Sequence, residues 1–342
     1  MKIDTYSHIP FDLAGDTAAR HRNNGLPESA QKFYAATMHH KIFKQGMEAL
    51  EATHSMSGLE GGGMIVEGDP GLGKTTLLNT YVSRVYKRPS AQPTEELTPL
   101  PVLIIRIPGR PTIPRVIEKL LEVGEHIKPY ARSSGTLDMR LNRMIVEQRV
   151  EMIVFDEYHH LLKRDRYTGD TLNFMKILCD EHRLATVCSG LLDGRDVLDG
   201  HPELRERLSF DHVLFQPFDM TTRASAIEFG QYMRGIAKAL DEAGVNCCPI
   251  NDKDMLLRIL LATQGKPRFI NKLFMRLILR LKDGRPITRT FMEQMYPDVP
   301  FNAHLGNFNP FSASYDKVEA RYEDYLKSLE DEAKRLKGKT RG

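Results

Sequence analysis

The run Gly-Asp-Pro-Gly-Leu-Gly-Lys-Thr at positions 68–75 constrains the fold more than any other part of the chain. It matches the phosphate-loop pattern G-x-x-x-x-G-K-[ST] at every defined position. An apolar run at 64–67 precedes it, and residues 75–86 follow with Leu, Val and Tyr at helical spacing. The glycines let successive N–H groups face an anion, and the helix adds its positive end. The pattern predicts a strand, loop and helix that bind a nucleoside triphosphate.

Each position of the loop and the residue after it is a candidate nucleotide contact. We expect Lys74 to reach the β and γ phosphates and the Thr75 hydroxyl to ligate magnesium. The full candidate set is Gly68, Asp69, Pro70, Gly71, Leu72, Gly73, Lys74, Thr75 and Thr76.

Apolar runs typical of buried parallel strands recur between helix-like segments. They cover residues 64–67, 100–107, 151–155, 185–188 and 212–215, and helix-like stretches include 33–54, 113–126 and 136–150. From about residue 220 the strand pattern disappears. The order predicts an α/β fold of three layers, in which helices cover a five-stranded parallel sheet, and a small helical lid domain after it.

We expect four segments along the chain. They are an N-terminal arm at 1–32, a nucleotide-binding domain at 33–218, a helical lid at 219–285 and a C-terminal extension at 286–342. Residues 315–342 carry an apolar stripe at helix spacing and a basic end. A helix that docks a partner and a helix that packs on its own domain both fit this pattern.

Acidic residues end the third apolar run. Asp156 is expected to hold magnesium, and Glu157 to orient or activate the attacking water. Ser189 ends the next run, where its hydroxyl could reach the γ-phosphate or the water. The carboxyl ends of parallel strands are where ligands bind in such sheets.

Three arginines are candidates for contact with the phosphates. Arg205 and Arg207 lie just before the fifth run, and either one could reach a neighbouring subunit's nucleotide as an arginine finger. Surface salt bridges are the alternative. Arg268 follows Pro267 at the start of a helix, from which it could swing towards the phosphates of its own chain.

The run Asp156-Glu157-Tyr158-His159-His160-Leu161-Leu162 resembles the second nucleotide motif of the TniB/TnsC group of AAA+ ATPases, which regulate DNA transposition in Tn7-like and CRISPR-associated transposons. The resemblance covers about residues 35–285. It includes the segments Asn173–Leu178 and Pro202–Arg205, and Gly265–Arg268 is similar to a sensor-2 motif.

The resemblance implies an AAA+ fold and ATP with Mg²⁺ as cofactors. It implies ATP-dependent self-assembly into a ring or filament on double-stranded DNA, bridging a transposase and a target-selection protein of the TniQ/TnsD type. Hydrolysis of ATP would then disassemble the complex rather than act on the DNA.

Arginines of the loop after the second apolar run and of the next helical stretch are candidate DNA contacts, because phosphate contacts need only positioned cations. They are Arg106, Arg110, Arg115, Arg132, Arg140 and Arg143, and any one of them could instead be a solvated surface charge. His159 and His160 suggest a metal site, but adjacent helical residues point about 100° apart. We therefore expect them to be structural.

Composition adds few constraints. Lys and Arg number 48 against 45 Asp and Glu, so the net charge of +3 does not by itself indicate a nucleic-acid binder. The four cysteines form no C-x-x-C pair, and no apolar run is long enough to span a bilayer. We expect a cytoplasmic protein with no membrane partner.

Three other functions share the phosphate loop. A small-molecule kinase would transfer the phosphoryl group to an acceptor, and the Gly-x-Pro-Arg segment argues against it. A secretion-type ATPase would favour a membrane segment. Sequence alone does not distinguish a helicase loader from a transposition regulator. Selective binding to a replicative helicase rather than a transposase would favour the loader.

Overall fold

The computed structural model describes residues 25–36, 40–59, 62–92, 94, 99–125, 136–162, 168–192, 201–282 and 284–339. Within these residues the chain divides into two compact units. The first comprises the described residues from Lys41 to Gln216, and the second comprises those from Pro217 onward together with those before Lys41.

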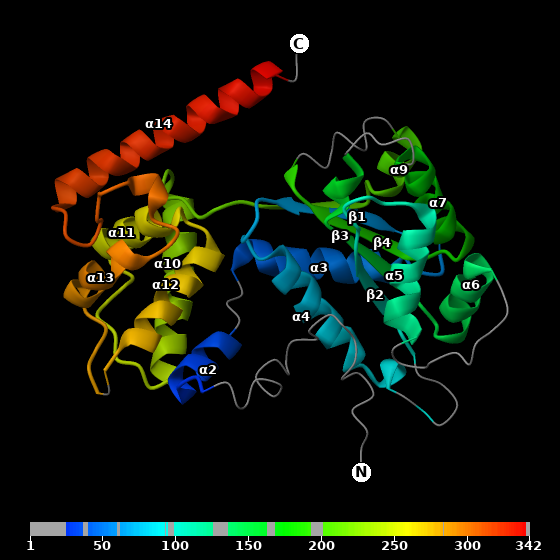
Figure 1. Cartoon of the computed structure of the whole chain (residues 1–342), viewed down its shortest axis with the longest axis horizontal. Coiled ribbons are helices and arrows are strands. Elements are labelled where there is room, and N and C mark those ends of the chain that lie inside the picture. Colours follow the sequence, from blue (N-terminus) through cyan, green and yellow to red (C-terminus); the bar gives the residue numbers. More distant parts are fainter. Residues whose placement is uncertain are drawn as a thin grey trace. The chain divides into compact units, whose positions relative to one another are not determined.

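A five-stranded parallel sheet forms the centre of the first unit (Figure 1). Its strands lie in the order β2-β3-β4-β1-β5. Every residue of β1, β3 and β4 is buried, which explains their nearly continuous apolar sequences. The bounds are β1 (Gly63–Gly68), β2 (Val102–Arg106), β3 (Met152–Asp156), β4 (Ala185–Gly190) and β5 (Asp211–Phe215).

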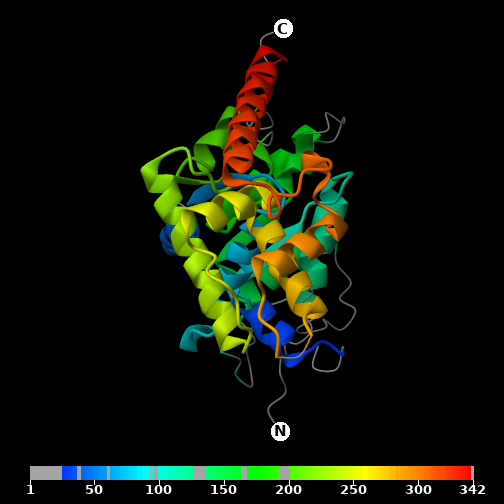
Figure 2. The ribbon, with the colours of Figure 1, turned by 90° about the vertical axis from the view of Figure 1, so that its left-hand side faces the viewer.

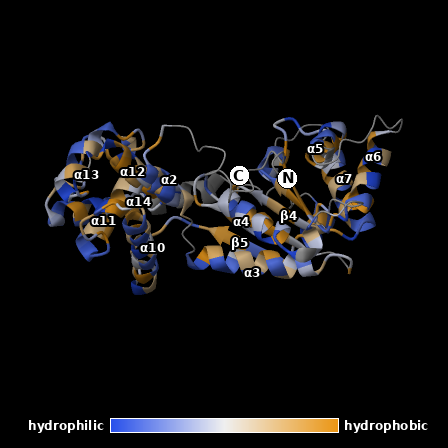
Figure 3. Cartoon of the chain, turned by 90° about the horizontal axis from the view of Figure 1, so that it is seen from below, coloured by the Kyte–Doolittle hydropathy of each residue, from blue (hydrophilic) through white to orange (hydrophobic). Residues whose placement is uncertain are grey.

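Helices cover both faces of this sheet, as Figure 3 shows for α3 on one side and α5, α6 and α7 on the other. Helix α4 packs against α3, and α5 packs on β2 and α6. Figure 3 shows hydrophobic residues concentrated on β4 and β5 between these layers. The helical elements are α3 (Lys41–Ser55), α4 (Lys74–Tyr86), η1 (Pro89–Ala91), α5 (Ile113–Glu125), α6 (Leu137–Glu147), η2 (Tyr158–Leu162), α7 (Thr168–Glu181) and α9 (Pro202–Arg207).

The second unit is helical (Figure 2). Thr222 and Ser225 form a capping box at the start of α10, and the Asp252 side chain accepts a hydrogen bond from Met255 N at 3.0 Å at the start of α11. Its elements are α2 (Glu28–Ala35), α10 (Arg223–Glu242), α11 (Lys253–Thr263), α12 (Pro267–Arg280), α13 (Arg289–Met295), η4 (Tyr296–Asp298), η5 (Ala303–Leu305) and α14 (Tyr315–Lys339).

Arg258 of α11 ties the C-terminal part of the second unit to its centre. The side chain is 1% exposed, and its Nε lies 2.9 and 3.0 Å from the two carboxylate oxygens of Asp254. Its Nη1 donates to the carbonyl of Pro310 and, at 2.8 Å, to that of Ala313. A buried guanidinium is tolerated because these acceptors replace water.

The alternation of strands and helices predicts the observed sheet, but the expected segments need correction at both ends. The helix expected at 33–54 is two helices, α2 and α3, and α2 packs against α10 and α12 in the second unit. Residues 28–32, assigned to the arm, therefore belong to a packed helix. The expected C-terminal extension also contributes buried residues, including Met292, Phe311 and Val318, to the core of the second unit.

Helix α14 is the longest helical element that the structure describes. Its first turns pack on α11, and the Tyr322 hydroxyl accepts a hydrogen bond from Met220 N at 2.9 Å. Figures 1 and 2 show its later turns extending beyond the other helices of the second unit. Among the described residues, no helix has both the length and the apolar character required to cross a bilayer.

Candidate functional site

The phosphate loop leaves β1 through a position that only glycine fits. Gly68 has φ +150°, and a Cβ there would lie 2.5 Å from the carbonyl oxygen of Phe215 on the adjacent strand β5. Gly73, with φ +109°, precedes the first residue of α4, and no side chain caps that helix. The N–H groups of the first turn are thus left for another acceptor, an arrangement that suits a phosphate.

Lys74 holds the loop in its present shape. Its ammonium donates to the carbonyl oxygens of Gly68 at 2.5 Å and Asp69 at 3.1 Å. Burial lowers the pKa of the Lys74 ammonium, and the carboxylates of Glu157 and Asp156 oppose that shift. The cation of the loop therefore lies within electrostatic range of both acids.

The other predicted loop residues differ in how exposed they are to solvent. Leu72 is buried and anchors the loop in the core of the first unit, whereas Thr75 and Thr76 are exposed at the first turn of α4. Their hydroxyls are accessible to a ligand. Asp69 and Gly71 are partly exposed, and Pro70 is exposed.

Asp156 and Ser189 lie side by side where β3 and β4 end. Asp156 Oδ1 accepts a hydrogen bond from Glu157 N at 3.0 Å. Asp156 Oδ2 and Ser189 Oγ are buried and make no well-formed hydrogen bond among the described residues. Burial is the main cause that raises the pKa of Asp156, although the Ser189 hydroxyl lies close enough to lower it. A buried polar atom without a partner is costly, so these two atoms point to a ligand.

Glu157 adopts a backbone conformation that non-glycine residues seldom take. Its φ is +58°, directly after the last residue of β3. The side chain is 35% exposed, and its Oε2 lies 3.4 Å from Nδ1 of His159. Strained backbone of this kind occurs at functional sites, where it fixes the direction of a side chain.

These groups fit a magnesium nucleotide. The partnerless Asp156 oxygen supplies the hard anionic ligand that magnesium prefers, and the accessible Thr75 hydroxyl follows the loop lysine. Uncapped N–H groups at the start of α4 suit the phosphates. The arrangement can therefore bind a triphosphate and hold a carboxylate, Glu157, beside it.

The two candidate finger arginines have different surroundings. Arg207 is 12% exposed; its Nη1 lies 2.8 Å from Asp180 Oδ1, and its Nη2 donates to the carbonyls of Cys179 and Leu184 at 3.2 Å. These bonds tie α9 to the end of α7. Arg205 is exposed on α9. Arg268 is exposed in the first turn of α12, in the second unit.

The candidate DNA contacts do not form one group. Arg106 ends β2 in register with Asp156, whose pKa its charge helps to lower against the effect of burial. It is therefore a neighbour of the acid pair. Arg110 and Arg115 are exposed in the loop and helix that follow.

The remaining two described candidates lie on α6, where Arg140 is partly exposed and Arg143 lies 3.4 Å from Glu147. Arg132 lies outside the described residues.

Sequence reasoning missed Glu67, which is fully buried at the end of β1. Its carboxylate accepts hydrogen bonds from the Tyr158 hydroxyl at 2.6 Å and from His212 Nε2 at 3.0 Å. It thereby links β1, η2 and β5 directly before the phosphate loop. A glutamate inside an otherwise apolar strand was the available signal.

Comparison with known families gives one match. The model of the family described as "Bacterial TniB protein" matches residues 34–216, more than half of the chain. No curated protein matches.

Two solved structures from Aeropyrum pernix resemble the chain. The ORC1 protein, solved in complex with DNA, shares 21% identity, with 84% of this chain and 77% of that chain covered and a TM-score of 0.52. The ORC2 protein, solved as ADPNP-ADP complexes, shares 12% identity, with 83% and 78% covered and a TM-score of 0.52. At these identities the likeness concerns the fold, which is that of AAA+ proteins.

Proposed function

The chain belongs to the TniB family, and on that premise we propose that it is an ATPase that assembles on duplex DNA when ATP is bound and links target-site selection to a DNA transposase. One observation carries the enzymatic part of this proposal. Asp156 Oδ2 and Ser189 Oγ lie buried on neighbouring strands without a well-formed hydrogen bond among the described residues. Glu157, with its strained backbone, directly follows Asp156, and the phosphate loop follows β1 in the same sheet.

ATP would bind through the residues of the phosphate loop. Lys74 would exchange its two carbonyl acceptors, on Gly68 and Asp69, for phosphate oxygens. Thr75 and Asp156 would hold magnesium, which when bound supplies charge neutralisation at the phosphates. Because the lysine already lies in the loop, little rearrangement is required of the protein.

Hydrolysis would depend on Glu157. Its carboxylate would accept a hydrogen bond from the attacking water and orient it. The left-handed backbone at Glu157 and the hydrogen bond from its N–H to Asp156 fix where the side chain starts. Ser189 would donate to the γ-phosphate or the water and so acquire the partner that it lacks.

Arg205 is the better candidate for the arginine finger because its side chain is exposed, whereas that of Arg207 is only 12% exposed. Arg207 is occupied by Asp180 and two carbonyls of its own unit, and removing it would break those bonds. Arg205 is exposed and can reach another subunit. This choice requires assembly for full activity, because the finger would act on a neighbour's nucleotide. Arg268 would report the nucleotide state to the second unit.

DNA would be held by phosphate contacts from exposed arginines, for which Arg110 and Arg115 are the strongest candidates. The proposed partners are a transposase and a target-selection protein of the TniQ/TnsD type, and the self-assembly is a ring or filament. Because the proposed target is duplex DNA, the proposed location of the protein is the cytoplasm. Hydrolysis would return the assembly to free subunits.

The test is binding of the purified chain to a fluorescent duplex with ATP and Mg²⁺, with ADP, or without nucleotide. We expect cooperative, sequence-tolerant binding with ATP alone. Lys74→Ala should lose that binding, because the loop no longer holds the phosphates. Arg84→Ala is the matched control: it removes an exposed cation from the same helix, α4, and should bind as the wild type does.

Binding that is independent of nucleotide, or equal binding by Lys74→Ala, would contradict ATP-gated assembly. Capture of a replicative helicase in preference to a transposase would replace the transposition role with that of a helicase loader.

A further inference from the structure

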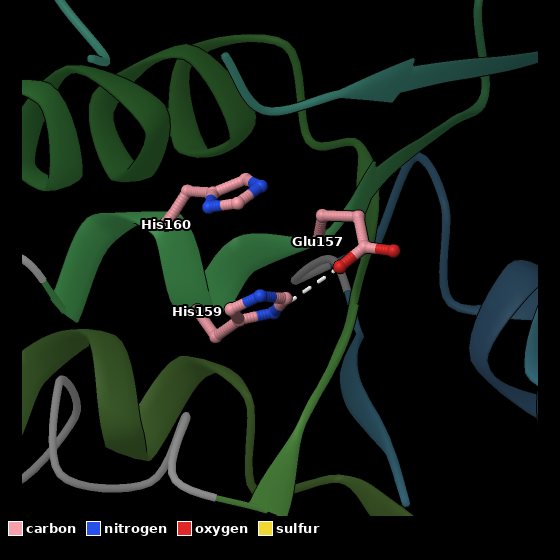
Figure 4. A group of neighbouring side chains, drawn as sticks. All are labelled: Glu157, His159 and His160. Atoms are coloured by element: carbon pink, nitrogen blue, oxygen red, sulfur yellow. Dashed lines mark ion pairs between the residues drawn. The ribbon is translucent and has the colours of Figure 1, made fainter. Parts of the chain in front are cut away.

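Glu157, His159 and His160 form a cluster that the proposed hydrolysis mechanism uses only in part. One potential metal-ligating atom from each residue lies within 4.8 Å of the others. Figure 4 shows the Glu157 carboxylate and the His159 ring facing each other, with the His160 ring nearby. This is the one such group of three or more His, Cys, Asp or Glu side chains found in the described part of the chain.

The local backbone brings the three side chains together. Adjacent histidines on an α-helix point about 100° apart, and this spacing argues against a shared ion. Here they lie in η2, a 3-10 helix, and their ring centroids are only 4.6 Å apart with an interplanar angle of 42°. The backbone at Glu157, with φ +58°, turns sharply before η2 begins, and this turn directs the Glu157 side chain towards the two histidines. Adjacent residues of a 3-10 helix are about 120° apart, so the observed closeness of the two rings, and not the type of helix, is what allows a shared ion.

His159 has a nitrogen positioned for a ligand. Its Nδ1 is buried and has no hydrogen-bond partner in the described part of the chain. It lies 3.4 Å from Glu157 Oε2. Two ligands held about 2.0–2.1 Å from a tetrahedral ion are about 3.3 Å apart. The separation of these two atoms already matches that geometry, and a rotation of the His160 side chain would supply the third ligand.

We propose that Glu157, His159 and His160 form a binding site for a divalent transition metal, with Zn²⁺ as the ion to test, and that an ion bound there prevents Glu157 from serving hydrolysis. Two imidazole nitrogens and one carboxylate oxygen with an open position are a typical zinc ligand set. Magnesium prefers oxygen ligands, so this set is chemically distinct from the Thr75 and Asp156 site.

The inhibitory part of this inference rests on the proposed function. A zinc ion would engage the Glu157 carboxylate, which could then not orient water. The phosphate loop contains none of the three ligands, so ATP would still bind. Zinc would thus hold the protein in its ATP-bound state.

Binding is tested first, without nucleotide, on the full chain with no histidine tag. Zn²⁺ affinity is measured by competition with a chromophoric chelator, and Co²⁺ absorption reports the coordination. His160→Phe keeps a ring beside His159 but removes both ring nitrogens. We expect at least about tenfold weaker Zn²⁺ binding and loss of the Co²⁺ spectrum. His182→Phe, which changes a partly exposed histidine bonded to Asn142, should match the wild type.

Equal Zn²⁺ affinity in the wild type and His160→Phe would overturn the site. Hydrolysis is tested second. Zn²⁺ should stop wild-type turnover, and His160→Phe should keep its turnover in the same Zn²⁺ concentration. Wild-type turnover that persists with Zn²⁺ bound would overturn the inhibitory role. If the chain fails to hydrolyse ATP even when a zinc-selective chelator has removed Zn²⁺ and Mg²⁺ is present, the proposed function fails. In that case the binding measurement still decides the zinc site.

Discussion

Two buried polar sites, one in each unit, differ in how well their hydrogen bonds are satisfied. In the second unit, the Arg258 guanidinium is enclosed yet bonded to Asp254 and to the carbonyls of Pro310 and Ala313. In the first unit, Asp156 Oδ2 and Ser189 Oγ are enclosed side by side and make no well-formed hydrogen bond in the described residues. A satisfied buried group stabilises a fold, whereas an unsatisfied one costs free energy that a ligand can recover. By this criterion Arg258 is a structural residue, whereas Asp156 and Ser189 are candidate functional residues.

The largest expected effect is on turnover in the first unit. Glu157→Gln keeps the shape of the side chain but removes its charge, so ATP hydrolysis should fall by about 10²- to 10⁴-fold. ATP binding should remain, because the loop is unchanged. Single-turnover hydrolysis and nucleotide titration measure the two quantities separately. A variant that hydrolyses ATP at the wild-type rate would remove Glu157 from the mechanism.

The next effect is on stability in the second unit. Arg258→Ala leaves the Pro310 carbonyl without this donor. Arg289 still reaches Asp254 and the Ala313 carbonyl. We expect a loss of about 1.5–3 kcal/mol in the free energy of unfolding of that unit. Denaturant titration measures it. Arg280→Ala, at an exposed arginine of α12, is the control and should change stability by no more than about 0.5 kcal/mol. Equal effects of the two substitutions would show that the buried network is not structural.

Ser189→Ala should act in opposite directions on stability and hydrolysis. Removing a hydroxyl that lacks a partner should leave the free energy of unfolding unchanged or raise it by about 1 kcal/mol. Hydrolysis should fall about tenfold, which corresponds to one lost hydrogen bond in the transition state. Thermal unfolding and turnover are measured on the same sample. Lower stability with normal turnover would place Ser189 with Arg258 as a structural residue.

The smallest effect concerns DNA. Arg110→Ala should lower the slope of log affinity against log salt concentration by about 1 if the arginine contacts one phosphate. Binding to a duplex at several salt concentrations with ATP measures the slope. Arg84→Ala should not change it. An unchanged slope for Arg110→Ala would assign this arginine to the solvated surface.

The sequence predicts the sheet well because each strand contains an apolar run bounded by polar, proline or glycine residues. The loop and the acid pair follow from local patterns alone. The break between α2 and α3 was not visible, because apolar residues continue on both sides of it and the second unit takes α2 for its own core.

The position of Arg106 beside Asp156 depends on which strands are neighbours, and local sequence does not contain that information. The same holds for Arg207, whose partners Asp180, Cys179 and Leu184 lie on another part of the first unit. The shape of η2 was equally hidden, because helical spacing fits a 3-10 turn and an α-helix alike over five residues.

The central claim is that the strained carboxylate beside the phosphate loop ends the DNA-bound state through hydrolysis. The most direct measurement is the lifetime of the complex on duplex DNA after free protein is removed, with ATP and Mg²⁺, for the wild type and Glu157→Gln. The account predicts that the wild type dissociates as ATP is consumed and that Glu157→Gln stays bound for at least about a hundredfold longer. Equal lifetimes would contradict it.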